Sequence, residues 1–160
     1  MMICRTSRAA AAAATVVFLT LAPAQAKEVK VSGTNTYVPT DSDVTPLTDE
    51  ANLLRTQSRS VLVTDDPELP FHLSTQDCAG TYLLDANGQV DSGYGYCDVV
   101  DGDNDIWWLS WTTKGDDGTW TVMGGTGKYE GMTGEGTSKV LSQSADGRFA
   151  LRWEGTANMK

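Results

Sequence analysis

Aromatic side chains concentrate in the second half of the chain, and their chemistry suits the binding of a small molecule. The set consists of Tyr94, Tyr96, Trp107, Trp108, Trp111, Trp120 and Trp153. Tryptophan and tyrosine offer large apolar faces with one polar edge, which is what an apolar or ring-containing ligand requires from a pocket. The alternative is that these side chains only fill the core and cover the outside of a small domain.

Alternation along the chain selects the tryptophans that share a face. Residues two apart in a strand point to the same side, so Trp107 and Trp111 lie together on one side of a strand predicted over residues 105–113. By the same rule, Trp153 shares a side with Phe149 in a later segment. We therefore predict a ligand-binding wall made of Trp107, Trp111, Trp120 and Trp153.

No segment carries a recognisable catalytic or cofactor-binding motif. Gly127-Lys128 does not belong to a phosphate-binding loop, because Val122 and Tyr129 replace the required glycine and hydroxyl residue. His72 is the only histidine, and the chain lacks a G-x-S-x-G signature. A catalytic pair of carboxylates stays open, since their separation depends on the fold. Catalytic residues are therefore unknown at this level, and we expect no cofactor.

Acidic residues recur over residues 98–105, where oxygen ligands at alternate positions could surround a calcium ion. Ile106 stands where an EF-hand loop needs glycine and Thr112 where it needs the closing glutamate, so an EF-hand is excluded. A looser calcium site in this turn is one alternative. We expect the other, a solvated turn, and predict no metal ligands.

The first 26 residues have the organisation of a secretory signal peptide. Arg5 and Arg8 precede an apolar stretch over residues 9–22, and Ala24-Gln25-Ala26 forms a small-x-small cleavage site. The stretch is shorter than the roughly 20 residues of a membrane span. We expect a secreted, periplasmic protein without stable membrane insertion, whose domain covers residues 27–160.

Cys78 and Cys97 are the two cysteines that follow the predicted cleavage site. An even pair in an oxidising compartment predicts a disulfide, here between neighbouring strands. A redox pair or a metal site would call for C-x-x-C spacing or for accompanying histidines. Closing a loop of about 20 residues should stabilise the fold by about 3 kcal/mol.

Loss of the signal peptide removes two of the 12 basic residues and none of the 21 acidic ones, which leaves a net charge of about −11. Such a surface repels phosphate backbones, so we expect no nucleic-acid partner. A cationic partner remains compatible with this charge. A well-solvated surface that has no charged partner is the simpler alternative.

Six glycines recur at short spacings between strand-like segments, at Gly124, Gly125, Gly127, Gly131, Gly134 and Gly136. Glycine reaches positive φ and allows backbones to approach closely. We therefore predict that these residues are structural and form a tight corner between two strands.

Strand signals separated by turns fill the second half of the chain. The turns are predicted at residues 101–103, 114–118 and 145–147. In the first half we predict strands over 29–38, 59–64 and 71–85, and a polar loop or arm around 40–58. Because no helical periodicity intervenes, the domain is predicted to be all-β, as an antiparallel barrel or sandwich.

Several segments together resemble a known family. They are Asp77-Cys78-Ala79-Gly80, Gly93-Tyr94-Gly95-Tyr96-Cys97, the glycine run and Arg152-Trp153-Glu154-Gly155-Thr156. With these, the C-terminal half resembles bacterial secreted relatives of the allene oxide cyclase-like barrels, a superfamily that includes plant dirigent proteins. The resemblance implies a single antiparallel eight-stranded barrel with a central cavity, and it makes a homo-oligomer plausible. No motif matches the plant cyclase's catalytic residues, so none is transferred.

Three functions are compatible with these observations. The leading hypothesis is a barrel that binds a small hydrophobic or aromatic ligand in its cavity. The second is an isomerase or cyclase acting in the same cavity, which a buried carboxylate or tyrosine there would favour. The third is a structural or protein-interaction module of the cell envelope, which an exposed apolar patch would indicate.

Overall fold

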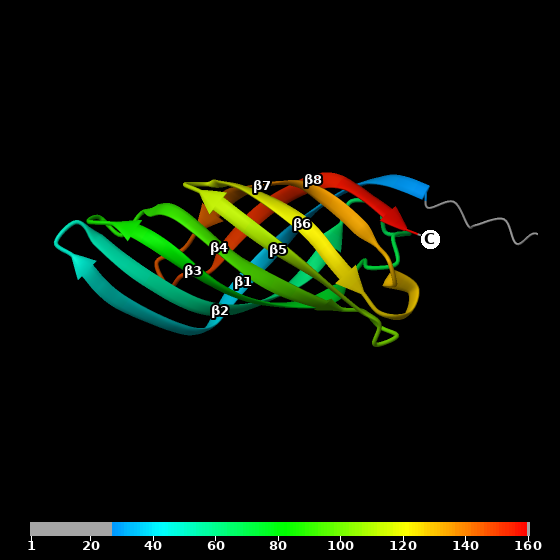
Figure 1. The fold of residues 1–160 in the computed structure, drawn as a ribbon, viewed down its shortest axis with the longest axis horizontal. Coiled ribbons are helices and arrows are strands. Elements are labelled where there is room, and N and C mark those ends of the chain that lie inside the picture. Colours follow the sequence, from blue (N-terminus) through cyan, green and yellow to red (C-terminus); the bar gives the residue numbers. More distant parts are fainter. Residues whose placement is uncertain (1–26, 160) are drawn as a thin grey trace, which may run out of the picture.

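The computed structural model describes residues 27–159 as one closed antiparallel barrel (Figure 1). Each strand pairs with its neighbours in sequence, and β8 closes the barrel on β1. The strands are β1 (Lys27–Thr48), β2 (Ala51–Thr64), β3 (Ser74–Asp85), β4 (Val90–Val100), β5 (Ile106–Lys114), β6 (Asp117–Gly125), β7 (Thr133–Gln143) and β8 (Phe149–Met159), with a short 3-10 helix, η1 (Gly127–Tyr129), between β6 and β7. The prediction of an all-β, eight-stranded antiparallel barrel is confirmed.

Residues 40–58, predicted as a polar loop or arm, form parts of β1 and β2 on either side of a turn at residues 49–50. β1 pairs with β8 only as far as Tyr37, which faces Phe149, whereas β2 stays paired with β3 up to Ala51. The rest of β1 and the start of β2 form a hairpin that extends past the barrel, on the left in Figure 1. Its polar residues and prolines reflect exposure, because from Thr40 onward nearly every residue of β1 faces solvent.

The opposite end of the barrel is sealed by the β2–β3 connection and by η1. Phe71 is fully buried and packs edge-on against Trp107, with ring centroids 5.7 Å apart. The hydroxyl of Tyr129, from η1, lies 3.0 Å from the carbonyl oxygen of Pro70. An ion pair between Asp65 and the guanidinium of Arg152 ties the same connection to β8. This end of the barrel is therefore closed.

The glycine run spans three elements instead of one corner. Gly127 begins η1 and Gly131 follows it, with φ angles of 54° and 73°, so the tight corner covers only residues 126–132. Gly134 lies inside β7, where a Cβ atom would come 2.8 Å from the carbonyl oxygen of Thr156. The remaining glycines of the run lie within strands, Gly124 and Gly125 in β6 and Gly136 in β7.

In the turn between β4 and β5, the ammonium group of Lys128 lies among the acidic side chains. Its Nζ atom is 2.8 Å from Asp101 Oδ2 and 2.6 Å from Asp103 Oδ2. The other oxygen of Asp101 accepts hydrogen bonds from the backbone N–H groups of Asp103 and Asp105. Within residues 27–159, no three His, Cys, Asp or Glu side chains are grouped to hold a metal ion.

Cys78 and Cys97 face each other across β3 and β4 and form a disulfide, with Cα atoms 4.1 Å apart. This confirms the predicted bond between neighbouring strands. The predicted signal peptide lies outside the described residues. None of the helical structure in residues 27–159 is long and apolar enough to cross a membrane.

Candidate functional site

A cavity of about 230 Å³ occupies the barrel between its sealed end and its open end, and its wall takes residues from all eight strands. A water molecule accounts for about 30 Å³ of liquid volume. The interior is therefore hollow enough for a small organic molecule, and the side chains do not form a solid core.

All four tryptophans of the predicted wall line this cavity. Trp107 lies toward the sealed end, beside Phe71. Trp120 and Trp153 meet edge to face, with centroids 6.3 Å apart. Strand alternation therefore places them on the inner surface, and their part in ligand binding stays a prediction.

Glycines on neighbouring strands explain why these indoles lie flat against the sheet. A Cβ atom on Gly95 would be 2.5 Å from Cζ2 of Trp111, and a Cβ atom on Gly155 would be 2.7 Å from Cζ2 of Trp120. Real Cβ atoms do not approach other atoms so closely, so glycine is required beneath each ring. Trp111 and Trp120 thus each occupy the place of two side chains.

Tyr94 and Tyr96 do not belong to the wall, although they were grouped with the tryptophans in the sequence. Both side chains project from the outer face of β4, since the inner positions there are taken by Gly95 and Cys97. Trp108 likewise faces outward from β5. The sequence did contain a signal that Tyr96 faces outward. Tyr96 is next to Cys97, and neighbouring residues of a strand point to opposite faces, so a disulfide inside the barrel places Tyr96 outside.

A cluster of buried, uncharged polar groups lies on the cavity wall. Gln76 Oε1 accepts hydrogen bonds from Asn35 Nδ2 at 2.6 Å, from Tyr37 Oη at 3.1 Å and from Ser60 Oγ at 3.1 Å. Asn35 Oδ1 accepts a further hydrogen bond from Trp153 Nε1 at 2.9 Å. Gln76 lines the cavity, and its Nε2 group can donate a hydrogen bond to a ligand.

Two tyrosines contribute hydroxyl groups to the wall. Burial raises the pKa of Tyr37, although hydrogen bonds with Asn35, Ser60 and Gln76 act in the opposite direction. Burial also raises the pKa of Tyr82, whose ring stacks on Trp111 with centroids 5.2 Å apart. Both phenols are therefore neutral at physiological pH and are poor bases. Tyr37 already donates its proton to Gln76 Oε1, whereas Tyr82 can donate a hydrogen bond to a ligand.

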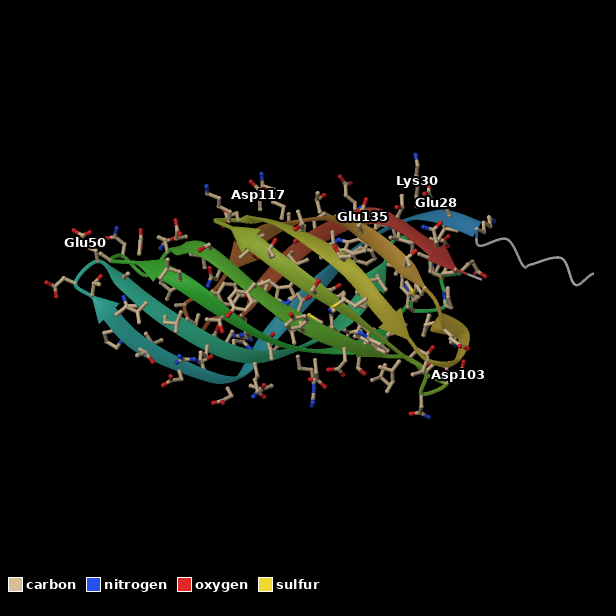
Figure 2. The ribbon with its side chains drawn as sticks, in the orientation of Figure 1. Glu28, Lys30, Glu50, Asp103, Asp117 and Glu135 are labelled. Atoms are coloured by element: carbon tan, nitrogen blue, oxygen red, sulfur yellow. A yellow bond between two sulfur atoms is a disulfide. The ribbon has the colours of Figure 1, made fainter. Side chains whose placement is uncertain are left out.

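Charged side chains are almost absent from the cavity. Among the described residues that line it, Asp116 in the β5–β6 turn is the one Asp, Glu, Lys, Arg or His. The other acidic residues lie outside, and Figure 2 shows Glu50, Asp117 and Glu135 pointing away from the barrel. An ionic ligand would lack a counter-charge in this cavity.

Sequence reasoning missed the polar cluster and Tyr82. Asn35 and Tyr37 share one face of the predicted strand over 29–38, which was a usable signal. Gln76 lies 41 residues from Asn35, and nothing in the sequence indicated that these two amides meet.

Solved structures with the same barrel include dirigent proteins. The pterocarpan synthase dirigent protein GePTS1 superimposes with a TM-score of 0.54 at 12% sequence identity, covering 91% of this chain and 96% of that chain. For the pterocarpan synthase dirigent protein PsPTS1, the TM-score is 0.53 at 10% identity, with 85% and 97% covered. No family model and no curated protein sequence matches the chain. The chain thus has a dirigent-like fold, and a shared fold does not establish a shared function.

Proposed function

We propose that this protein binds a small, uncharged, aromatic or otherwise hydrophobic molecule inside its barrel. The observation that carries the proposal is a cavity with an aromatic wall, one buried polar cluster and a single charged residue at its mouth. Ligand pockets combine mostly apolar walls with a few convergent polar groups in this way.

The wall also suggests how such a molecule lies. Trp111 and Tyr82 stack beside the open end and offer an aromatic surface to a ring. Deeper in the barrel, Gln76 Nε2 can donate to a carbonyl, ether or hydroxyl oxygen. The ligand class is therefore a neutral molecule with a ring or apolar body and at least one hydrogen-bond acceptor.

The structural neighbours support this proposal. Both are named as pterocarpan synthases, so barrels of this fold take part in small-molecule chemistry. Membership of the allene oxide cyclase-like superfamily, through bacterial secreted relatives, is part of the same proposal and rests on the sequence motifs alone. Secretion to the periplasm and self-association into a homo-oligomer are also parts of this proposal, and they too rest on the sequence alone.

A second candidate is an isomerase or cyclase that works in the same cavity. Tyr82 favours it, because a neutral phenol on the cavity wall can donate a hydrogen bond to an oxygen atom that gains negative charge during a reaction. Confinement of a reactive intermediate away from water would supply the rest of the rate enhancement. Conversion of a bound compound, followed by mass spectrometry, distinguishes this candidate from simple binding.

Titration with N-phenylnaphthylamine, a neutral aromatic dye, tests the binding proposal. We expect saturable one-to-one binding that quenches tryptophan emission. Trp111→Ala should weaken binding about tenfold, because an aromatic contact is lost. Trp108→Ala is the matched control, since this indole lies on the outer face of the same strand, and it should bind like the wild type.

A second variant separates loss of the site from loss of the fold. Val140 lines the cavity from β7, and Val140→Trp should fill part of the cavity and abolish dye binding while the circular dichroism spectrum stays unchanged. The proposal is wrong if the folded wild-type protein does not bind the dye. It is also wrong if both cavity variants, Trp111→Ala and Val140→Trp, bind the dye as well as the wild type does. The envelope-interaction hypothesis would then become the leading one.

A further inference from the structure

The outer wall of the barrel carries a shallow groove that is separate from the cavity. It encloses about 450 Å³ and lies over β1, β2, β3 and β4. The groove is located where the long β1–β2 hairpin leaves the barrel, since Asp41 and Asp43 follow the last residue of β1 that pairs with β8.

The strand register arranges the side chains of this groove in two rows. One row runs through Tyr96, Ala79, Gln57 and Asp41, and the other through Tyr94, Thr81, Arg55 and Asp43. Neighbouring strands are about 4.8 Å apart, and residues two apart along a strand are separated by about 7 Å. Each row therefore runs for about 14 Å. Both rows begin at a tyrosine and end at an aspartate.

The two tyrosines form the aromatic side of the groove. Tyr94 is 61% exposed and Tyr96 is 58% exposed, so both side chains are accessible to a ligand. Ala79 is the small residue directly beside Tyr96 on the next strand, which keeps the floor of the groove low. Exposed aromatic rings over a low floor offer a stacking surface for a flat apolar face.

The opposite side of the groove combines donors with acceptors. Asp41 and Asp43 accept hydrogen bonds, Arg55 donates them, and Gln57 can do both. Arg55 is held in place by Asp43, at 3.5 Å, and by a hydrogen bond to Thr45 Oγ1 at 3.2 Å. An anionic ligand would meet two carboxylates here, and a cationic ligand would meet Arg55.

We propose that this groove binds a neutral carbohydrate chain built of pyranose rings. A pyranose ring has an apolar C–H face, which packs on an aromatic ring, and a rim of hydroxyl groups that both donate and accept hydrogen bonds. The tyrosines match the faces of the rings, and the mixed polar side matches their rims. Two equivalent rows side by side accommodate more than one ring, so the ligand is an oligosaccharide.

Amide NMR titrations of the uniformly labelled protein with cellotetraose, mannotetraose and N-acetylchitotetraose test this site. We expect at least one of them to shift the backbone signals of Asp41, Gln57, Ala79, Tyr94 and Tyr96 in a saturable way. The signals of cavity residues such as Gln76 should not move. Trp111→Ala should leave sugar binding unchanged, so failure of the cavity proposal and failure of this one are distinguishable.

Variants of the exposed tyrosines provide the decisive comparison. Tyr94→Ala and Tyr96→Ala should each weaken sugar binding about tenfold or more, whereas Tyr96→Phe keeps the ring face and should retain most of the affinity. Trp108→Ala removes an exposed aromatic ring on β5 outside the groove and should have no effect. All three positions are at the surface, so the four variants are expected to fold.

Three results would overturn the proposal. The first is that none of the three oligosaccharides binds the folded wild-type protein at millimolar concentration. The second is sugar binding that is unaffected by either tyrosine-to-alanine change. The third is tetralysine binding in the groove in place of the sugars, which would identify a cationic peptide as the partner.

Discussion

The indole of Trp111 on β5 occupies the space that a side chain at Gly80 on β3 would need. A Cβ atom on Gly80 would lie 2.6 Å from Cη2 of Trp111. Because β4 lies between these two strands, one indole covers the inner face of three neighbouring strands. The glycines of the inner face and the aromatic wall of the cavity are therefore a single structural feature.

Gly80→Ala should lower the free energy of unfolding by about 1 to 3 kcal/mol, because the added methyl group overpacks the wall against Trp111. In the double variant with Trp111→Leu, part of this cost should disappear, since the obstructing ring is gone. Urea unfolding of the four proteins measures the coupling. Gly102→Ala is the control, because a Cβ atom there would meet nothing within 4 Å, and equal stability of the two alanine variants would contradict the prediction.

Reduction of the disulfide between Cys78 and Cys97 should destabilise the barrel by roughly 2 to 5 kcal/mol, mainly because the unfolded chain gains conformational freedom. Urea unfolding with and without a thiol reductant measures the effect. A variant with both cysteines changed to alanine should be as unstable as the reduced wild type and insensitive to the reductant. Two free thiols in protein purified from an oxidising compartment would show that the bond does not form.

The acid sensitivity of the barrel should depend in part on Asp101. Burial raises the pKa of this carboxyl, but hydrogen bonds from Lys128, Tyr129 and the backbone outweigh burial and lower the pKa from 3.8 to about 2. A depressed pKa in the folded state stabilises the protein above the unfolded-state pKa, near pH 4, and this contribution is lost as the pH falls toward 2.

Asp101→Asn should therefore reduce stability by about 2 kcal/mol at neutral pH, through the lost charge-assisted hydrogen bonds. The difference from the wild type should narrow as the pH falls from about 4 toward 2. Unfolding free energies of the two proteins measured at several pH values give the difference at neutral pH and its change with pH. A difference that stays constant over this range would show that the charge of Asp101 contributes nothing.

Leu73 combines an unfavourable backbone conformation with an exposed side chain. Its φ angle is 60° and its side chain is 62% exposed, so a non-glycine residue is strained there without much burial in return. Leu73→Gly should raise the free energy of unfolding by about 0.5 to 1 kcal/mol. Leu141, equally exposed but in a strand, is the control, and Leu141→Gly should destabilise the barrel.

Calcium should leave the thermal midpoint of this protein unchanged, because the ammonium group of Lys128 already lies between the carboxylates of Asp101 and Asp103 in the acidic turn. A ligand that binds only the folded state raises the midpoint by mass action, so a scan with and without millimolar calcium detects binding directly. A rise in the wild type would show that the ion displaces the ammonium group.

Local patterns predicted the strands of the second half and the disulfide well. The turns around 101–103 and 145–147 separate β4 from β5 and β7 from β8, because turn residues act over a few neighbouring positions. In the segment 40–58, local composition was a poorer guide. Prolines and acidic residues are typical of loops, and in this hairpin they occupy an exposed edge, where strands also tolerate them.

The sequence by itself determined which tryptophans share a face, since a strand turns alternate residues to opposite sides whatever surrounds it. Only the tertiary structure decided which face is the inside. Closure of the barrel brings Asn35 against Gln76 and Lys128 against Asp101, pairs that no local pattern connects. Whether the interior is solid or hollow depends on how all eight strands pack together, and this is a property of the closed barrel as a whole.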